Sequence, residues 1–305
     1  MNFLQLQTRV AQEAGIDLSV ADDETAVQAW INQAYQHVSG LFNWPWLVQN
    51  TIFQTVADIT TGTVSINAGD TTVTFTDAPA SSVATDYMIQ FTETSLDWYF
   101  VTSHTGGATT ATISVPFVGS SNVTGAAYIL RKVFYSLDST VDRIVDMRQS
   151  ITQDKIEWVD VRTFDRLVPD PEYTGPPIYY LTVGMDASNN WRVVLYPTPS
   201  TVLNIQLRYY QKITELSSDS DEPLVPAKWQ NALVFGALAM YGHDFIDDSR
   251  VKSAMVRYGN VIGEMMKHYS QVPDARFVIQ PWDTRVRRNI FPLRFPSNFP
   301  EYYGY

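Results

Sequence analysis

Residues 51–134 change the periodicity of the sequence from that of a helix to that of short strands. Six runs alternate apolar with polar residues, and 18 threonines, which favour strands, lie in this stretch. Asn67-Ala68-Gly69-Asp70 and Thr105-Gly106-Gly107 supply the residues that hairpin turns need. The stretch therefore predicts a small antiparallel β-barrel or β-sandwich. The six predicted strands are 63–66, 71–75, 87–91, 98–101, 112–115 and 127–133.

Helical periodicity flanks this stretch on both sides. Residues 2–14 predict a short helix that Gly15 ends. A second helix starts at Asp22 or Asp23, either of which can cap it, and it stops near Asn43 because Pro45 has no amide donor. After Pro226 two more helices follow, and the short link 243–248 predicts that they are antiparallel neighbours.

Residues 135–211 have a mixed pattern. A short helix is expected at 160–168, followed by a proline-rich loop. Three strands are expected near 178–183, 191–196 and 203–210.

These patterns predict an α+β fold with an α-helical bundle core, an inserted small antiparallel β-barrel or β-sandwich domain, and an extended C-terminal arm. A chain of 305 residues is long enough for such a core. The predicted ranges are 1–50 for the first part of the helical core, 51–134 for the inserted β domain, 135–270 for the mixed β segment and second part of the helical core, and 271–305 for the arm.

The last 35 residues predict a binding arm. They hold five prolines, which forbid a long helix, and eight aromatic residues, which are too many for a solvated disordered tail. Arginines between the aromatics could indicate single-stranded nucleic acid, but three acidic residues offset the five arginines, so docking on a protein is favoured. The candidate partner-binding residues are Phe277, Trp282, Arg285, Arg287, Arg288, Phe291, Arg294, Phe295 and Phe299.

Charge argues against a general nucleic-acid binder. The net charge is −11, and residues 10–130 contain 11 acidic residues and no Lys or Arg. Because non-specific DNA affinity comes mainly from cations, we expect no binding to duplex DNA.

The sequence predicts no catalytic, cofactor or metal site. Cysteine is absent, which excludes disulfides and thiolate chemistry, and no phosphate-cradling or nucleophile motif occurs. The acidic clusters at 219–222 and 243–248 are interpreted as polar turns. Trp30, Trp44 and Trp46 are interpreted as core residues in preference to a sugar-stacking platform. No signal peptide or membrane span is expected, so the chain should remain in the cytosol that makes it.

The order of these parts is similar to that of head-to-tail adaptor (connector) proteins of tailed bacteriophages, particularly those of short-tailed phages. An early helix closes with Asn43-Trp44-Pro45-Trp46, and the Thr-rich β insertion ends in Tyr128-Ile129-Leu130-Arg131-Lys132. Leu203-Asn204-Ile205-Gln206-Leu207-Arg208-Tyr209-Tyr210 then leads to Pro226-Ala227-Lys228-Trp229 and a helix. The resemblance extends over nearly the whole chain.

This resemblance implies a structural, non-enzymatic virion protein of the tail or neck, made in the host cytoplasm. It implies a ring, usually of twelve copies, whose helices form the wall. The implied partners are other copies of the chain, the portal protein and the tail nozzle protein. The arm would reach the portal protein, and fibre proteins are a further candidate partner. DNA would pass through the ring without specific binding, and the acidic residues would either approach its path or only keep an outer surface soluble.

Two other classes of function stay open. One is a receptor-binding or fibre-attachment tail protein that uses the β domain, for which a trimer is expected in place of a large ring. The other is a cell-wall hydrolase of the virion, against which the missing catalytic motif counts.

Overall fold

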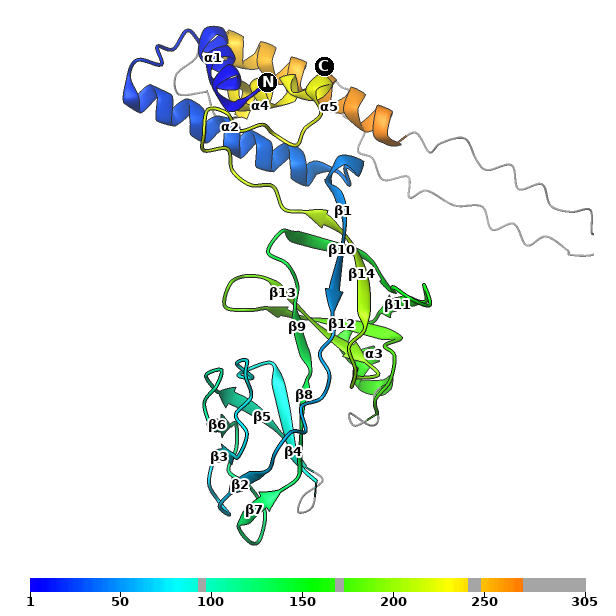
Figure 1. Cartoon of the computed structure of the whole chain (residues 1–305). Coiled ribbons are helices and arrows are strands. Elements are labelled where there is room, and N and C mark those ends of the chain that lie inside the picture. The colour runs from blue at the N-terminus through cyan, green and yellow to red at the C-terminus, as the bar shows by residue number, and fades with distance from the viewer. Residues whose placement is uncertain (93–96, 168–172, 241–247, 271–305) are drawn as a thin grey trace, which may run out of the picture.

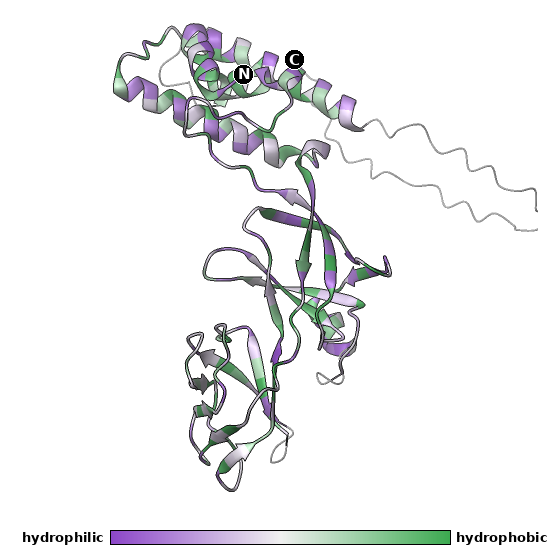
Figure 2. Ribbon diagram, viewed as in Figure 1, coloured by the Kyte–Doolittle hydropathy of each residue, from purple (hydrophilic) through white to green (hydrophobic). Residues whose placement is uncertain are grey.

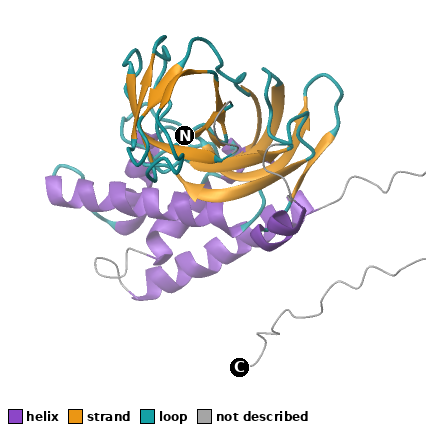
Figure 3. Ribbon diagram, turned by 90° about the horizontal axis from the view of Figure 1, so that it is seen from below, coloured by secondary structure: helices purple, strands orange, loops and turns teal. Residues whose placement is uncertain are grey.

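The chain folds into three tiers stacked along its length (Figure 1). A computed structural model describes residues 1–92, 97–167, 173–240 and 248–270. A helical tier lies at one end, a curled middle sheet follows, and a curled distal sheet lies at the other end (Figure 1). Figure 3, viewed from below, shows the curved strands above the layer of helices.

The helical tier joins the two ends of the described chain. Its members are α1 (Phe3–Ala14), α2 (Ala21–Leu41), α4 (Asn231–Met240) and α5 (Asp248–Ser270), with short 3₁₀ turns at Pro45–Leu47 and Ala227–Trp229. Asn2 and Gln5 form a capping box at the start of α1, and Gly15 ends α1 in the left-handed conformation with φ 78°, as the sequence predicted.

The predicted cap of α2 is wrong. The helix begins at Ala21, and the residue before it, Val20, makes no side-chain cap. Asp22 and Asp23 lie in the first turn instead. There their carboxylates stabilise the positive end of the helix dipole, which explains why acidic residues gather at this position.

The distal sheet contains the six strands that the sequence predicted and one more, β7, which has a single large apolar residue. The strands are β2 (Val64–Ile66), β3 (Thr72–Phe75), β4 (Tyr87–Phe91), β5 (Trp98–Ser103), β6 (Thr110–Ile113), β7 (Val123–Ala126) and β8 (Tyr128–Lys132). Their order is β7-β2-β3-β6-β5-β4-β8, and every pair is antiparallel. The two edge strands are consecutive in sequence, so the sheet curls around its own core.

The middle sheet also has seven strands, in the order β1-β14-β10-β11-β12-β13-β9. It includes the three strands and the short helix expected between residues 135 and 211. Its elements are β1 (Val48–Gln54), β9 (Phe134–Ser136), β10 (Val141–Gln149), β11 (Lys155–Trp158), α3 (Val161–Leu167), β12 (Tyr179–Met185), β13 (Trp191–Tyr196) and β14 (Asn204–Gln211).

The prediction of a helical bundle core with one small inserted barrel is therefore wrong. The described residues form fourteen strands in two seven-stranded sheets, and the helices make one tier of three. The missed strands are β7 of the distal sheet and β1, β9, β10 and β11 of the middle sheet. In β10 the pairing with β14 shifts register between Val141 and Arg143 and again between Ile144 and Asp146, so the strand lacks a simple alternation of apolar and polar residues.

Each tier has its own hydrophobic core. Separate clusters of buried apolar residues lie within the helices, inside the distal sheet and inside the middle sheet. Figure 2 shows both hydrophobic and hydrophilic residues in all three tiers. The predicted domain ranges stay a prediction, and β1 runs across the predicted boundary at residue 51 while pairing with β14 along Val48–Gln54.

Candidate assembly surfaces

Helix α4 lies at the centre of the helical tier. Its sequence is apolar on all sides, and Ala232, Leu233, Val234, Gly236, Ala237, Leu238 and Ala239 are buried. A helix that is apolar all round is stable in water only when neighbours cover every side.

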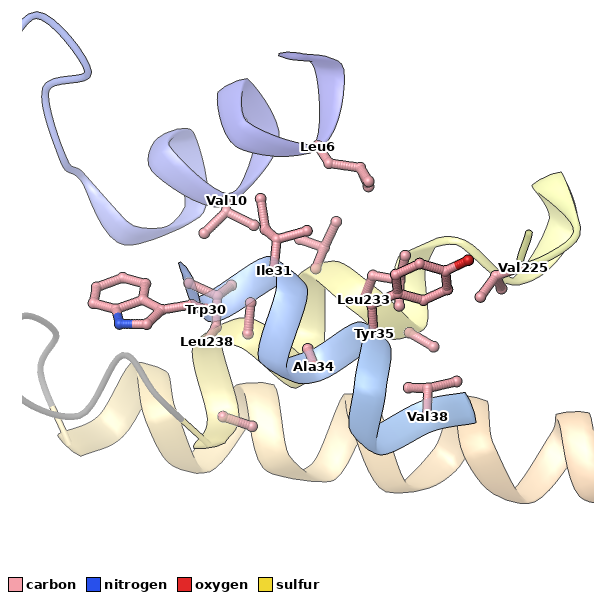
Figure 4. Close-up of a cluster of buried hydrophobic side chains, with 14 of the residues drawn as sticks. Leu6, Val10, Trp30, Ile31, Ala34, Tyr35, Val38, Val225, Leu233 and Leu238 are labelled. Atoms are coloured by element: carbon pink, nitrogen blue, oxygen red, sulfur yellow. The ribbon is translucent and has the colours of Figure 1, made fainter. Parts of the chain in front are cut away.

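Helices α1, α2 and α5 surround α4 in a fixed order. At Gly236 an added Cβ would lie 3.1 Å from the Tyr258 ring of α5 and 3.3 Å from Cβ of Ala34 in α2, so the glycine lets both helices approach closely. A 2.8 Å hydrogen bond between His37 Nδ1 and the Tyr258 hydroxyl joins α2 directly to α5. Apolar side chains of α1 pack against α2 and α4 on the other flank (Figure 4). Helix α2 therefore lies between α1 and α5.

The remaining side of α4 opens into a groove between α1 and α5. Phe235 and Leu238 of α4 line its floor. The exposed side of α1 from Leu4 to Glu13 forms one wall, and the first turns of α5 form the other. The groove has a volume of about 870 Å³. Because α2 lies between α1 and α5, this groove is across α4 from α2.

The rim of the groove is basic. Arg250 donates from Nη1 to the Ala14 carbonyl at 3.3 Å and so satisfies a carbonyl at the end of α1. Arg257 Nη1 lies 3.8 Å from Glu13 Oε2, and its guanidinium carbon lies 5.6 Å from the centre of the Phe235 ring. Together with Arg9, the described residues of the rim include three arginines and one glutamate, a set that favours a carboxylate-bearing ligand.

The opposite side of the tier, α2 with residues 213–225, is acidic. Asn32 fixes this segment along α2 by donating to the Leu216 carbonyl at 3.0 Å and accepting from the Leu216 amide at 2.9 Å. Glu215 accepts from Gln36 at 2.9 Å. These two segments contain no Lys or Arg and have seven acidic residues: Asp22, Asp23, Glu24, Glu215, Asp219, Asp221 and Glu222. The last three lie where the segment reaches the start of α1, since the Asp219 and Asp221 carbonyls accept from the Leu4 and Phe3 amides.

The acidic cluster at 219–222 is a polar turn, as the sequence predicted. Asp221 accepts from the backbone amides of Ser217 and Ser218, both at 2.8 Å, and these hydrogen bonds lower the pKa of its carboxyl below the usual value. Across the described residues, no three His, Cys, Asp or Glu side chains come together in a way that could hold a metal ion. The other predicted turn, 243–248, lies almost wholly outside the described residues.

The middle and distal sheets meet at a joint that two ion pairs stabilise. Arg131 Nη2 lies 2.8 Å from Asp58 Oδ2, and the two side chains are only 8% and 14% exposed. Arg131 Nε also donates to Asp58, and the guanidinium stacks 4.8 Å from the centre of the Trp98 ring. The second pair joins Arg192 of β13 to Asp86 at 2.8 Å. Since breaking a buried pair is costly, the joint should orient the distal sheet firmly.

An exposed apolar recess lies on the middle sheet. Trp158 is 57% exposed and Val145 is 44% exposed. With Tyr180, Thr182 and Trp191 they line a recess of about 370 Å³. A large exposed aromatic residue on a strand is typical of a protein-binding surface.

The predicted arm residues, from Phe277 to Phe299, lie outside the described residues, which end at Ser270 with α5. The prediction that they bind a partner therefore stays a prediction. The tryptophan prediction is confirmed at two positions, because Trp30 and Trp44 are 7% and 0% exposed in the helical core. Trp44 donates from Nε1 to the Val38 carbonyl at 2.6 Å. These two rings therefore cannot serve as an open sugar-stacking platform.

Among the described helices, none is long and apolar enough to cross a membrane. The sequence pattern of one family, the SU10 adaptor protein, matches residues 81–285, which is about two thirds of the chain and includes parts of all three tiers. A search of curated proteins gave no match.

Proposed function

The chain belongs to the SU10 adaptor protein family, and from this we propose that it is a head-to-tail adaptor that forms a ring between the portal and the tail of a bacteriophage. Membership makes the chain a structural phage adaptor protein and a component of the virion. The ring, its position and its partners are the proposal. The family match over residues 81–285 is the observation that carries it.

The proposed ring has twelve copies and joins the portal protein to the tail nozzle protein of a short-tailed phage. The helices would form its wall, and residues 271–305 would reach the portal through Phe277, Trp282, Phe291 and the arginines near them. Two features support a role in assembly. The helical tier offers a basic groove and an acidic side across α4, and the joined β tiers extend away from the helices (Figure 1).

In this proposal DNA passes through the ring without being bound. The excess of acidic residues supports this, since carboxylates repel phosphate and cannot release its counterions. Fibre proteins could bind the outside of the same ring.

Electron cryomicroscopy of complete virions tests the proposal. A small tag inserted in the loop at Asn189 marks the chain, because this loop lies at a turn between β12 and β13. We expect one tag per copy in a ring of twelve at the neck. Tags at the tips of fibres, or in groups of three, would refute the proposal.

A further inference from the structure

We infer that neighbouring copies bind each other head to tail through the helical tier, with the outer side of α2 of one copy in the groove between α1 and α5 of the next. This inference rests on the proposed ring. It names the two surfaces that make each contact within that ring.

Within the described part of the chain, the groove is the side of the central helix that no other element covers. Three sides of α4 are covered by α1, α2 and α5, and the fourth exposes part of Phe235 at the groove floor. The wall along α1 runs from Leu4 to Glu13, which is about 13 Å at 1.5 Å per residue. This length accommodates two to three turns of another helix, which would complete the packing around α4.

The outer side of α2 has the shape and composition for this place. Its exposed residues include Ala29, Gln33 and Gly40, which are small or neutral. A Cβ added at Gly40 would meet nothing within 4 Å, so the backbone there is open to close approach. Asp22 is exposed at the start of the helix, and Glu215 is exposed beside Gln36. When α2 enters the groove of a neighbouring copy, its surface of small residues therefore has a carboxylate near each end.

Charge complementarity favours a second copy, and not the chain's own arm, as the occupant of the groove. Among the described residues, the groove rim has three arginines and one glutamate, whereas α2 with residues 213–216 has four acidic residues and no Lys or Arg. The arm has five arginines and three acidic residues, so its charge has the same sign as the rim. Pairs of arginine and carboxylate that lose water on contact form charge-assisted hydrogen bonds.

The two surfaces lie across α4 from each other, so the contact is heterologous. A copy that fills its neighbour's groove still has its own groove free for another copy. Such contacts repeat with a constant rotation, and they form a ring when that rotation closes, as in the proposed assembly. The geometry of one helical tier is therefore sufficient to propagate the assembly.

Charge reversal on each surface tests the inference. The groove variant is Arg9→Glu with Arg257→Glu, and the α2 variant is Asp22→Lys with Glu215→Lys. Lys155→Glu on β11 is the control, because Lys155 is exposed and belongs to the middle sheet. Sedimentation velocity of the full chain over a range of concentrations measures self-association, and thermal unfolding checks that each variant is folded.

We expect wild type and the control to associate alike and each double variant alone to associate at least ten-fold more weakly. An equimolar mixture of the two double variants should associate again, because each normal surface meets its normal partner and the two reversed surfaces also complement each other. Association of both variants at wild-type strength, or no recovery in the mixture, would overturn the inference and leave the ring itself intact.

A cross-linking experiment covers the case in which copies associate only in the virion. The chain has no cysteine, so Ala29→Cys with Ser253→Cys places the only thiols on the α2 side and in the groove wall. A short bis-maleimide should give a ladder of linked copies from virions with both cysteines and none from virions with one. A ring seen by microscopy without a ladder refutes the named surfaces, whereas virions without a ring refute the proposed function.

Discussion

Replacing Arg131 by methionine should strongly destabilise the joint between the middle and distal sheets. The Arg131 side chain is 8% exposed and holds Asp58, which is 14% exposed, through Nε and Nη2. A methionine side chain at this position cannot neutralise the carboxylate that remains buried. Removing one partner of a buried ion pair costs about 3–5 kcal/mol.

The pair of Arg148 with Asp146 gives a comparison in which only the arginine is partly exposed. Their contact is shorter, at 2.6 Å, and Asp146 is 12% exposed, but the Arg148 side chain is 44% exposed. Water reaches this guanidinium and screens the pair, so Arg148→Met should cost less than Arg131→Met. Burial of the arginine, and not distance, sets the difference between the two variants.

Urea unfolding followed by tryptophan fluorescence measures both effects, and Trp98 reports on the joint because Arg131 stacks on its ring. With m values of about 1–3 kcal/mol per molar, the Arg131→Met midpoint should fall by at least about 1 M. Adding Asp58→Leu should recover most of the loss, since the buried carboxylate that Arg131 neutralised is then also removed. Equal midpoints for Arg131→Met and Arg148→Met would refute the reasoning.

Four further predictions concern other parts of the chain. Truncation after Gln271 should leave a folded body that fails to attach in virion assembly, and loss of cooperative melting would contradict this. Deleting residues 60–129 should preserve the other two tiers, because Ile59 and Leu130 are hydrogen-bonded to each other at 2.9 and 3.0 Å, whereas deleting 51–134 removes part of β1 and should unfold the middle sheet. Burial raises the pKa of Tyr180 to about 12. The contribution of neutral Tyr180 to the free energy of unfolding should therefore be complete below about pH 10 and decline above it, because the phenol ionises first in the unfolded chain; alkaline melting curves and phenolate absorbance measure this decline. Duplex DNA should show no measurable binding in a gel-shift assay near physiological salt, and a clear shift would contradict the proposed passage of DNA without binding.

The elements with regular spacing were predictable from the sequence. In α2 the apolar residues Val27, Ile31, Ala34 and Val38 recur at three and four positions, and all are buried. In β3 the alternation is equally plain, with Val73 and Phe75 buried between exposed threonines. The local pattern is enough to predict both elements, because each buries a single apolar face against its core.

The middle sheet was not predictable from local pattern. β1 is mostly polar, and β10 is interrupted by two register shifts, so their pairing depends on β14, more than fifty residues further along the chain. The groove is equally non-local, since Arg250 reaches Glu13 over a separation of 237 residues. The acidic excess was visible in the sequence, but the placement of α2 across α4 from the basic rim was not.

The helical tier also sets an order for folding during synthesis. Asn32 of α2 binds Leu216, which follows 184 residues later, so the N-terminal helices cannot complete their core until α4 and α5 have been made. The end of α5 is 229 residues beyond the end of α2, so at about 5–20 residues per second that wait is roughly 10–45 s. The distal sheet, whose strands are contiguous from Val64 to Lys132, can form meanwhile. Phe3, Val10 and Ile31 have no core to enter during that interval, and the nascent chain exposes them to chaperones until its last helices emerge.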